Sequence, residues 1–440
     1  MTPGRLREWL LKGLLLMAPI AYIPWADEPY RAFREELFQL AGAGVLLLWL
    51  HGRITRTEGV SLSPRGIKTD FILFACGTGA LLLSLLVNGG SPSAVINVAL
   101  GGTLFLALYN ALTAETAFDW TKLFIFAAVL NGLLGIAQYF GFDPLFLSLD
   151  PAFHNIYRRY LVAGFMDSPN MLAPFLASFV PLAYSFFMHE TARGKTVAWT
   201  LRSIFLLTTI AFTQNFAALL PLGAVLGAML CYFTLRRPAE GGKRPALKLA
   251  ASWAMALLVV AAAATAYARQ DDTSRLLKRY SMDERRMQNE AGLMMFRGAP
   301  LVGKGPGFFY AHFEEYRRAV WFDAPPQRLP DRPAHQAHND YLQLLAEGGL
   351  LAALPFGALL LLWLYRHGAA HSGRQSSPPL PYPRAPLLLG AIGGFWVIAL
   401  NGMGNFPFHI APLAITALFW GAVAAVLINA HSTNGKSAVS

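Results

Sequence analysis

Long apolar runs recur along almost the whole chain, and they constrain its fold more than any other feature. Each has about 17 to 23 residues, the length that a helix needs to cross roughly 30 Å of hydrocarbon. A single segment in lipid satisfies its backbone hydrogen bonds only as a helix. The predicted spans are approximately 8–24, 37–52, 69–88, 93–113, 120–140, 170–189, 197–213, 215–235, 247–267, 342–366, 384–403 and 408–430. We therefore expect an all-α polytopic membrane protein with about twelve transmembrane helices.

The composition agrees with this fold and excludes a soluble domain on one anchor. The 440 residues are 55% hydrophobic and 14% charged, and the mean hydropathy is +0.41. The first run carries Arg5, Arg7 and Lys12, as a signal peptide would. Because many spans follow it, we interpret it as a retained span.

The net charge of +11 reflects topology and does not indicate nucleic-acid binding, because the basic residues sit in particular loops instead of one stripe. They follow the second, eighth and tenth spans: Arg53, Arg56, Arg65 and Lys68; Arg236, Arg237, Lys243, Arg244 and Lys248; and Arg366, Arg374 and Arg384. Two of the short alternate loops, 88–93 and 401–409, contain no Lys or Arg. The positive-inside rule then predicts that both termini are cytoplasmic.

Two predicted outward segments are long enough to carry chemistry, 141–169 and 268–341. We expect a membrane region at 1–267, with spans one to nine and the smaller loop. It is followed by a large, mainly helical outer loop at 268–341. A second membrane region comes next, at 342–440, with spans ten to twelve and a short cytoplasmic tail. The first part of the large loop is dense in charge but keeps apolar residues at helical spacing, which is typical of helices at a membrane surface.

Within the large loop, GAPLVGKGPGFFY at 298–310 predicts a tight turn, because Gly303, Gly305 and Gly307 surround Lys304 and Pro306. Such a turn can direct several backbone N–H groups at an anion, or it can be a plain connector.

The stretch HQAHNDYLQLLAEGG at 335–349 places ionisable residues where the tenth span begins. Polar groups at that depth are costly unless they act or find partners. Asn339 or Asp340 can cap the helix, with Gln343 completing a capping box. His338 precedes the cap and can take a proton when neutral. His335 and His338 lack a third metal ligand, so we expect no metal site.

The chain resembles the O-antigen ligase and polymerase superfamily of bacterial envelope glycosyltransferases. Its span layout carries the resemblance, with GFMDSPNMLAPFLASFVPLA at 164–183, APLVGKGPGFF at 299–309 and QAHNDYLQLLAEGGL at 336–350. The resemblance implies a glycosyltransferase-C-like fold in the bacterial inner membrane. It also implies glycan transfer from undecaprenyl diphosphate at the periplasmic face, without metal, nucleotide or other cofactor. In the ligase branch the acceptor is the lipid A core oligosaccharide.

The family's histidine matches His338, and its outward-loop arginine matches Arg285 or Arg286. Where relatives often have a Ser-Arg pair, this chain has Gln214, Asn215 and Phe216, so one expected arginine is missing.

The chemistry of such a transfer fits residues in both outward segments. A diphosphate leaving group needs guanidinium donors when no Mg²⁺ is bound. The pairs Arg158-Arg159 and Arg285-Arg286 supply four, although solvated or headgroup-bound arginines are the alternative. Neutral His338 is the candidate general base for an inverting displacement, and Asn339 and Asp340 are candidate substrate-binding residues. A satisfied, structural histidine is the alternative for His338.

We therefore predict an O-antigen ligase, and we keep three rivals. An O-antigen polymerase uses a second carrier-linked glycan as the acceptor. A protein O-oligosaccharyltransferase tends to have a longer C-terminal region. A lipid-linked glycan transporter, the non-enzyme alternative, predicts charged residues in the midplane of its helices. The glycan, the core sugar and the oligomeric state do not follow from the sequence.

Overall fold

The computed structural model describes residues 2–22, 32–55, 61–64, 66–144, 162–235, 246–254, 272–320, 334–371 and 380–437. Within these ranges the chain is all-α, with no strand. The helices are α1 (Pro3–Ile20), α2 (Ala32–Ile54), α3 (Lys68–Asn88), α4 (Pro92–Ala111), α5 (Ala117–Tyr139), α7 (Pro169–Ala177), α8 (Val180–His189), α9 (Arg193–Thr213), α10 (Phe216–Leu235), α12 (Asp272–Gly298), α13 (Phe308–Val320), α14 (Asp340–His371), α15 (Arg384–Asn401), the 3₁₀ helix η3 (Pro407–His409) and α16 (Ala411–Ser437).

Ten segments in the described residues are long and apolar enough to cross a membrane, so the chain is a multi-pass membrane protein. They correspond to ten of the twelve predicted spans. Of the other two, 8–24 overlaps α1, which carries four charged residues in its first ten positions and is not among the ten. The prediction at 247–267 lies mostly outside the described residues.

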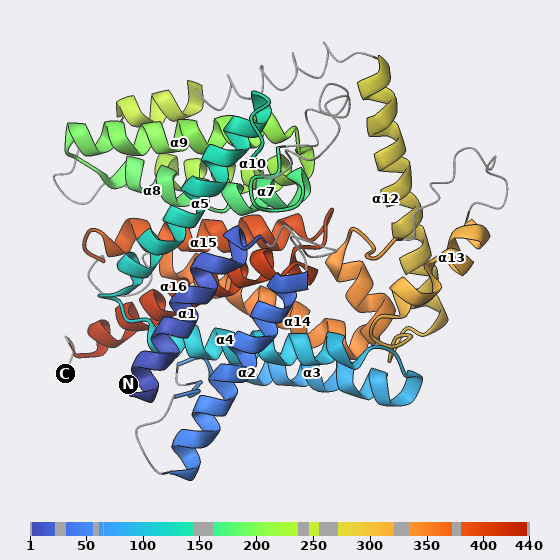
Figure 1. The fold of residues 1–440 in the computed structure, drawn as a ribbon. Helices are drawn as coiled ribbons and strands as arrows, with labels where there is room; N and C mark the ends of the chain where they lie inside the picture. Colours follow the sequence, from blue (N-terminus) through green and yellow to red (C-terminus); the bar gives the residue numbers. More distant parts are fainter. Residues whose placement is uncertain are drawn as a thin grey trace.

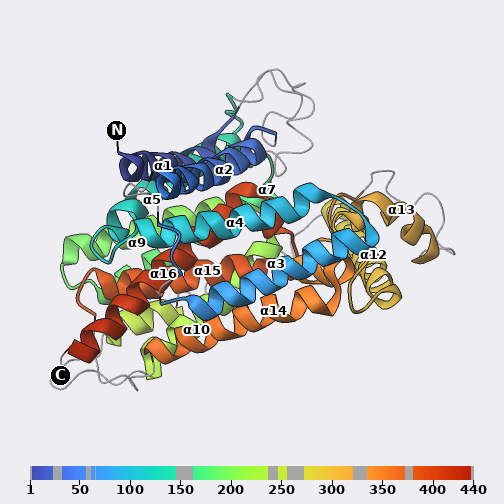
Figure 2. The same ribbon diagram turned by 90° about the horizontal axis from the view of Figure 1, so that it is seen from below.

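The centre of the bundle consists of α7, α8, α15 and α16 (Figures 1 and 2). In their spanning segments 78% to 83% of the residues are buried, whereas the share is 22% to 28% in α2, α3, α9 and α14. Phe124 of α5 packs its ring against Phe175, Phe179, Phe419 and Trp420, with centroids 5.1 to 6.2 Å apart. The peripheral helices therefore turn apolar faces outward, as helices in contact with lipid do.

The span predicted at 170–189 is two helices, α7 and α8, separated by a turn at Ser178. Pro174 and Pro181 each remove one backbone donor near this turn. Trp420 donates its indole N–H to Ser178 Oγ at 3.1 Å. A Cβ on Gly394 would lie 2.6 Å from the Ser178 carbonyl oxygen, so this glycine permits the close approach of α15.

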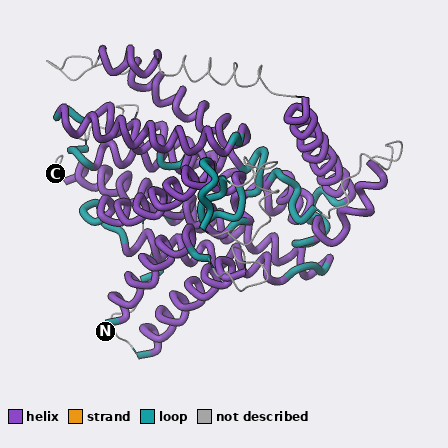
Figure 3. The backbone as a smooth tube through the Cα atoms, turned by 45° about the horizontal axis from the view of Figure 1, so that its top comes forward, coloured by secondary structure: helices purple, strands orange, loops and turns teal. Residues whose placement is uncertain are grey.

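The two ends of the bundle differ in what covers them. Helices α12 and α13 lie at one end, and α1 begins and α16 finishes at the other (Figures 1 to 3). We call these the loop end and the terminal end. Turn 88–91 and segment 402–409 also lie at the loop end, since Ser91 N–H donates to the Pro306 carbonyl at 2.7 Å and Arg285 donates to the Gly404 carbonyl at 2.7 Å.

The first part of the large loop is helical as predicted and forms α12. A second helix, α13, follows the glycine turn, and the two helices have a small core of their own at the loop end. Its buried members are Met287, Ala291, Met295, Phe309, Phe313, Ala334, Ala337 and Ala346. This core joins both helices to the start of α14. It therefore positions the charged side chains of α12 against the stretch that contains His338.

Candidate functional site

Helix α14 begins directly after His338, and the helix start fixes the position of this histidine. Asn339 is the N-cap, because its Oδ1 accepts the N–H of Leu342 at 3.1 Å. Gln343 Oε1 accepts the N–H of Ala337 at 3.0 Å, two residues before the cap. The predicted capping box from Asp340 to Gln343 is therefore wrong in register. His338 has a φ of +50°, a conformation that few side-chain-bearing residues adopt.

Asp340 ties the start of α14 to segment 402–409. Its backbone N–H donates to the Gly402 carbonyl at 2.9 Å. Its buried carboxylate accepts the N–H of Phe408 at 3.0 Å through Oδ2, and Oδ1 lies 2.6 Å from Nδ1 of His409. Both carboxylate oxygens are engaged within the protein. Asp340 thus holds segment 402–409 against the start of α14.

His338 is mostly buried, and its Nδ1 has no hydrogen-bond partner in the described protein. Its ring meets the ring of Phe406 edge-on at 4.8 Å. Burial and, second, the positive charge of Arg285 lower the pKa of His338 to about 4, although a hydrogen bond with the Gln336 backbone opposes the shift. The imidazole is therefore neutral near pH 7, with one nitrogen free to accept a proton.

The adjacent arginines Arg285 and Arg286, which the sequence does not separate, point in different directions. Arg285 is half-buried, and its Nη1 donates to the Gly404 carbonyl at 2.7 Å. Burial lowers the pKa of its guanidinium. Arg286 is exposed and pairs with Glu290 at 2.8 Å, one turn further along α12. The structure thus places Arg285 beside His338. The predicted pair at 158–159 lies outside the described residues.

Four carboxamides near His338 and Arg285 share a feature with Nδ1 of His338. A side-chain oxygen of each is buried without a hydrogen-bond partner in the described protein: Gln288, Asn289, Gln336 and Asn405. The first two follow Arg285 by three and four residues on α12, which is the same helix face. Gln336 hydrogen-bonds with its backbone to His338, and Asn405 lies between the Gly404 and Phe406 contacts. Unpaired buried acceptors are costly, and these four oxygens are available to accept hydrogen bonds from water or from the hydroxyl groups of a ligand.

The glycine turn docks on a break in α14, where Gly349 has a φ of +63°. The break frees backbone groups, and the turn binds them: Lys304 N–H donates to the Ala346 carbonyl at 2.9 Å and Gly305 N–H to the Glu347 carbonyl at 3.0 Å. A Cβ on Gly303 would lie 2.4 Å from the Glu347 carbonyl group. The turn therefore needs glycine because two backbones touch there.

Part of the turn does bind a carboxyl group, and this group is the protein's own Glu347. The N–H of Phe309, at the start of α13, donates to Glu347 Oε1 at 3.2 Å, and the Gly307 backbone also hydrogen-bonds to this carboxylate. Gln343 Nε2 donates to the same oxygen at 3.3 Å. These N–H groups at the N-terminus of α13 therefore already bind a side chain of the protein itself.

His409 is a site residue that sequence reasoning missed. Segment 401–409 entered the prediction only as a loop without Lys or Arg, although His409 is its one ionisable side chain. An ionisable residue next to a span was the available signal. Its contact with Asp340 joins two segments that are 69 residues apart, which no local pattern predicts.

Gln214 and Asn215, which stand where relatives often have a Ser-Arg pair, have structural contacts. Gln214 caps the end of α9 with a φ of +50°. Asn215 Nδ2 donates to Asn170 Oδ1 at 2.8 Å, and its Oδ1 accepts the N–H of Ala218 at 3.1 Å.

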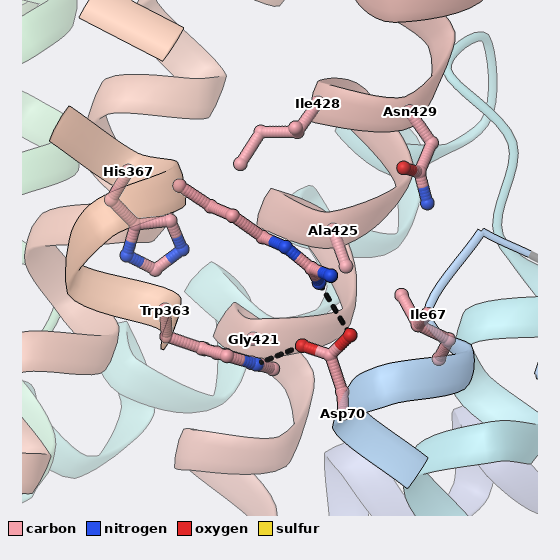
Figure 4. Close-up of a pocket in the computed structure, with 9 residues that line it drawn as sticks. Ile67, Asp70, Trp363, His367, Gly421, Ala425, Ile428 and Asn429 are labelled. Atoms are coloured by element: carbon pink, nitrogen blue, oxygen red, sulfur yellow. Dashed lines mark hydrogen bonds and ion pairs between the residues drawn. The ribbon is translucent and has the colours of Figure 1, made fainter. Parts of the chain in front are cut away.

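A second group of buried polar side chains lines a pocket at the terminal end, between α3, α14 and α16 (Figure 4). Asp70, with only 5% of its side chain exposed, pairs with Arg366 and accepts the indole N–H of Trp363 at 2.7 Å. Trp396 donates to Nδ1 of His367 at 3.0 Å. The ionisable groups in this pocket have partners within the protein, so we interpret the pocket as a structural contact between helices.

The described residues contain no group of three or more His, Cys, Asp or Glu side chains arranged to hold a metal ion. No protein-family model matches this sequence, and no curated protein matches it either.

Proposed function

We propose that the chain transfers a glycan from undecaprenyl diphosphate to the lipid A core oligosaccharide, as an O-antigen ligase of the bacterial inner membrane. The observation that carries the proposal is the buried, unpartnered Nδ1 of His338 beside Arg285 and four unpaired carboxamides. A neutral base, a guanidinium and hydroxyl acceptors are what such a transfer needs. The resemblance to the ligase superfamily supports the same reading.

In the proposed reaction, Arg285 binds the donor diphosphate and stabilises the charge that develops on it. His338 takes the proton of the acceptor hydroxyl, which then attacks the anomeric carbon. A single displacement inverts this carbon, and no metal takes part. The loop end faces the periplasm, both termini face the cytoplasm, and the carboxamides bind sugar hydroxyls.

The rivals share much of this machinery and differ in the acceptor. A polymerase transfers to a second carrier-linked glycan, and a protein O-oligosaccharyltransferase transfers to a hydroxyl side chain. A transporter needs no base and leaves the donor unchanged.

The test is transfer by the purified full-length chain, with the undecaprenyl-diphosphate-linked glycan and three acceptors in parallel: lipid A core, a second donor molecule and an acceptor peptide. We expect product on lipid A core. Product on a second donor or on the peptide assigns the corresponding rival. Absence of any transfer, with glycan movement across sealed vesicles, contradicts an enzyme.

A further inference from the structure

His409 and Asp340 form a close pair at the loop end. Nδ1 of His409 lies 2.6 Å from Asp340 Oδ1, and the second carboxylate oxygen accepts the N–H of Phe408. The carboxylate therefore fixes the orientation of the ring. About one third of the His409 side chain is exposed, at 35%. Because Nδ1 is taken, Nε2 is the nitrogen that can meet another molecule.

The charged groups around His409 are acidic. Partial removal from water lowers its pKa, but the carboxylates of Asp340, Glu347 and Glu35 outweigh this, so the pKa of His409 is raised on balance. The ends of α15 and α16 that adjoin this loop, residues 396–401 and 411–416, carry only neutral side chains. Arg285 reaches the same segment at Gly404. The Asp340 and Glu347 carboxylates are themselves engaged by backbone N–H donors.

Segment 402–409, which contains this histidine, also contacts His338. Phe406 contacts the His338 ring, and Asp340 follows His338 by two residues. Burial keeps His338 neutral, whereas neighbouring carboxylates favour charge on His409. Two titratable groups whose environments push their pKa values apart are suited to act as base and acid in one reaction.

We propose that His409, held by Asp340, donates its Nε2–H to the donor diphosphate and acts as the acid of the transfer. This role rests on the proposed function and adds a second contact for the diphosphate beside Arg285. It is a role for an imidazolium, since a neutral ring with Nδ1–H on Asp340 has no second N–H to give.

The transfer balances with two histidines. The acceptor oxygen forms its bond to the anomeric carbon, and its proton moves to Nδ1 of His338. The bond from this carbon to the diphosphate oxygen breaks, and the electron pair stays on that oxygen. His409 gives its Nε2 proton to the departing diphosphate. Exchange with water then restores a neutral His338 and a charged His409.

The test measures binding of farnesyl diphosphate, with farnesol as the uncharged control, to the purified full-length chain between pH 6 and pH 9. The variants are His409→Gln, His409→Lys and His338→Gln, each checked for folded protein by gel filtration. At low pH we expect His409→Gln to bind farnesyl diphosphate roughly ten- to a hundredfold more weakly than the unaltered chain. This difference shrinks as the pH rises through the His409 pKa, and the comparison at each pH cancels ionisation of the probe.

His409→Lys separates charge from architecture, because a lysine stays charged across this range. We expect it to bind farnesyl diphosphate tightly at pH 9, where the unaltered chain has weakened, and we expect His338→Gln to keep the pH dependence of the unaltered chain. If His409→Gln prefers farnesyl diphosphate as strongly as the unaltered chain does at every pH, the role of His409 is overturned and the proposed function is not. Failure of the unaltered chain to prefer farnesyl diphosphate over farnesol overturns the proposed function with it.

Discussion

Ionisable side chains that are largely or partly buried lie around both ends of α14, but the two groups differ in how completely they are paired. At the terminal end, Asp70 binds Arg366 and Trp363 (Figure 4). At the loop end, Nδ1 of His338 has no partner in the described protein, and Arg285 donates to a single backbone carbonyl, that of Gly404, among the described residues.

The difference separates two uses of buried polarity. A buried charge that is paired within the protein joins helices, and removing its partner is costly. A buried polar group without a partner reduces stability and persists where it serves a ligand or a reaction. The comparison therefore predicts that substitutions at the terminal end affect folding, whereas substitutions at the loop end affect turnover.

After the loss of His338, the largest effect should come from Arg285. Arg285→Ala should lower transfer by about 10² to 10³, the usual effect of losing one preorganised donor to a developing anion. Arg285→Lys should also be impaired, because an ammonium lacks the bidentate fork. The matched control is its neighbour: Arg286 is exposed and paired with Glu290, so Arg286→Ala should transfer normally. Steady-state transfer by purified proteins measures both. An equal loss of transfer in Arg285→Ala and Arg286→Ala would contradict the assignment of the diphosphate contact to Arg285.

At the terminal end, Asp70→Asn should reduce the free energy of unfolding by about 3 kcal/mol, because it leaves a partly buried guanidinium without its counter-charge. Chemical unfolding in detergent measures this loss, and transfer per folded molecule should stay normal. Asp119→Asn is the control, since Asp119 pairs with Lys122 at 2.8 Å on the surface and should change little. A transfer defect in folded Asp70→Asn would contradict a purely structural pocket.

The pH profile distinguishes a perturbed histidine from an ordinary one. Because the pKa of His338 is lowered to about 4, kcat/KM should change less than about twofold from this group between pH 7 and pH 5. A histidine with a pKa of about 6.5 would lose roughly thirtyfold over that range. Arg285→Gln should move the acidic limb of kcat/KM to higher pH, since it removes a positive charge that lowers the pKa of His338.

The same pKa has a consequence for stability. A group that prefers to be neutral when folded takes up protons on unfolding below its ordinary pKa. The contribution of His338 to stability should therefore fall as the pH drops from about 6.5 toward 4. Chemical unfolding at a series of pH values measures this loss, and an acid limb of kcat/KM centred near pH 6.5 in the unaltered chain would contradict the burial of His338.

The smallest effect should come from His335. It is exposed and stacks on Tyr310 with a centroid distance of 4.7 Å. His335→Ala should cost less than about 1 kcal/mol in stability and leave transfer unchanged, because it loses only a surface ring contact. Thermal unfolding and transfer assays on one preparation measure both. A large transfer defect would shift the site toward His335.

The spans were predictable from the sequence because hydrocarbon imposes a length and an apolar composition on each. The break in α14 was not, although GAPLVGKGPG and Gly349 were visible. The freed carbonyls of Ala346 and Glu347 are satisfied by residues more than 40 positions earlier, and only the fold shows that. Likewise the sequence indicated His338, but neighbouring helices decide between Arg285 and Arg286.

Site residues that depend on pairing across the fold were the hardest to predict. Asn339 and Asp340 were both candidates for the helix cap, and the structure pairs Asp340 with His409 instead. The cap is Asn339, one residue earlier. A single residue of register separates the two roles, and local propensity does not resolve such a difference.

The central claim is that the unpartnered nitrogen of His338 takes a proton during transfer. Single-turnover transfer by purified His338→Gln protein, with donor binding and folded fraction measured on the same sample, tests it most directly. We predict normal insertion, normal donor binding and a transfer rate lower by roughly 10² to 10⁴, the usual contribution of positioned proton transfer. Near-normal transfer by folded His338→Gln protein would contradict the claim and leave His338 as a residue of the helix start alone.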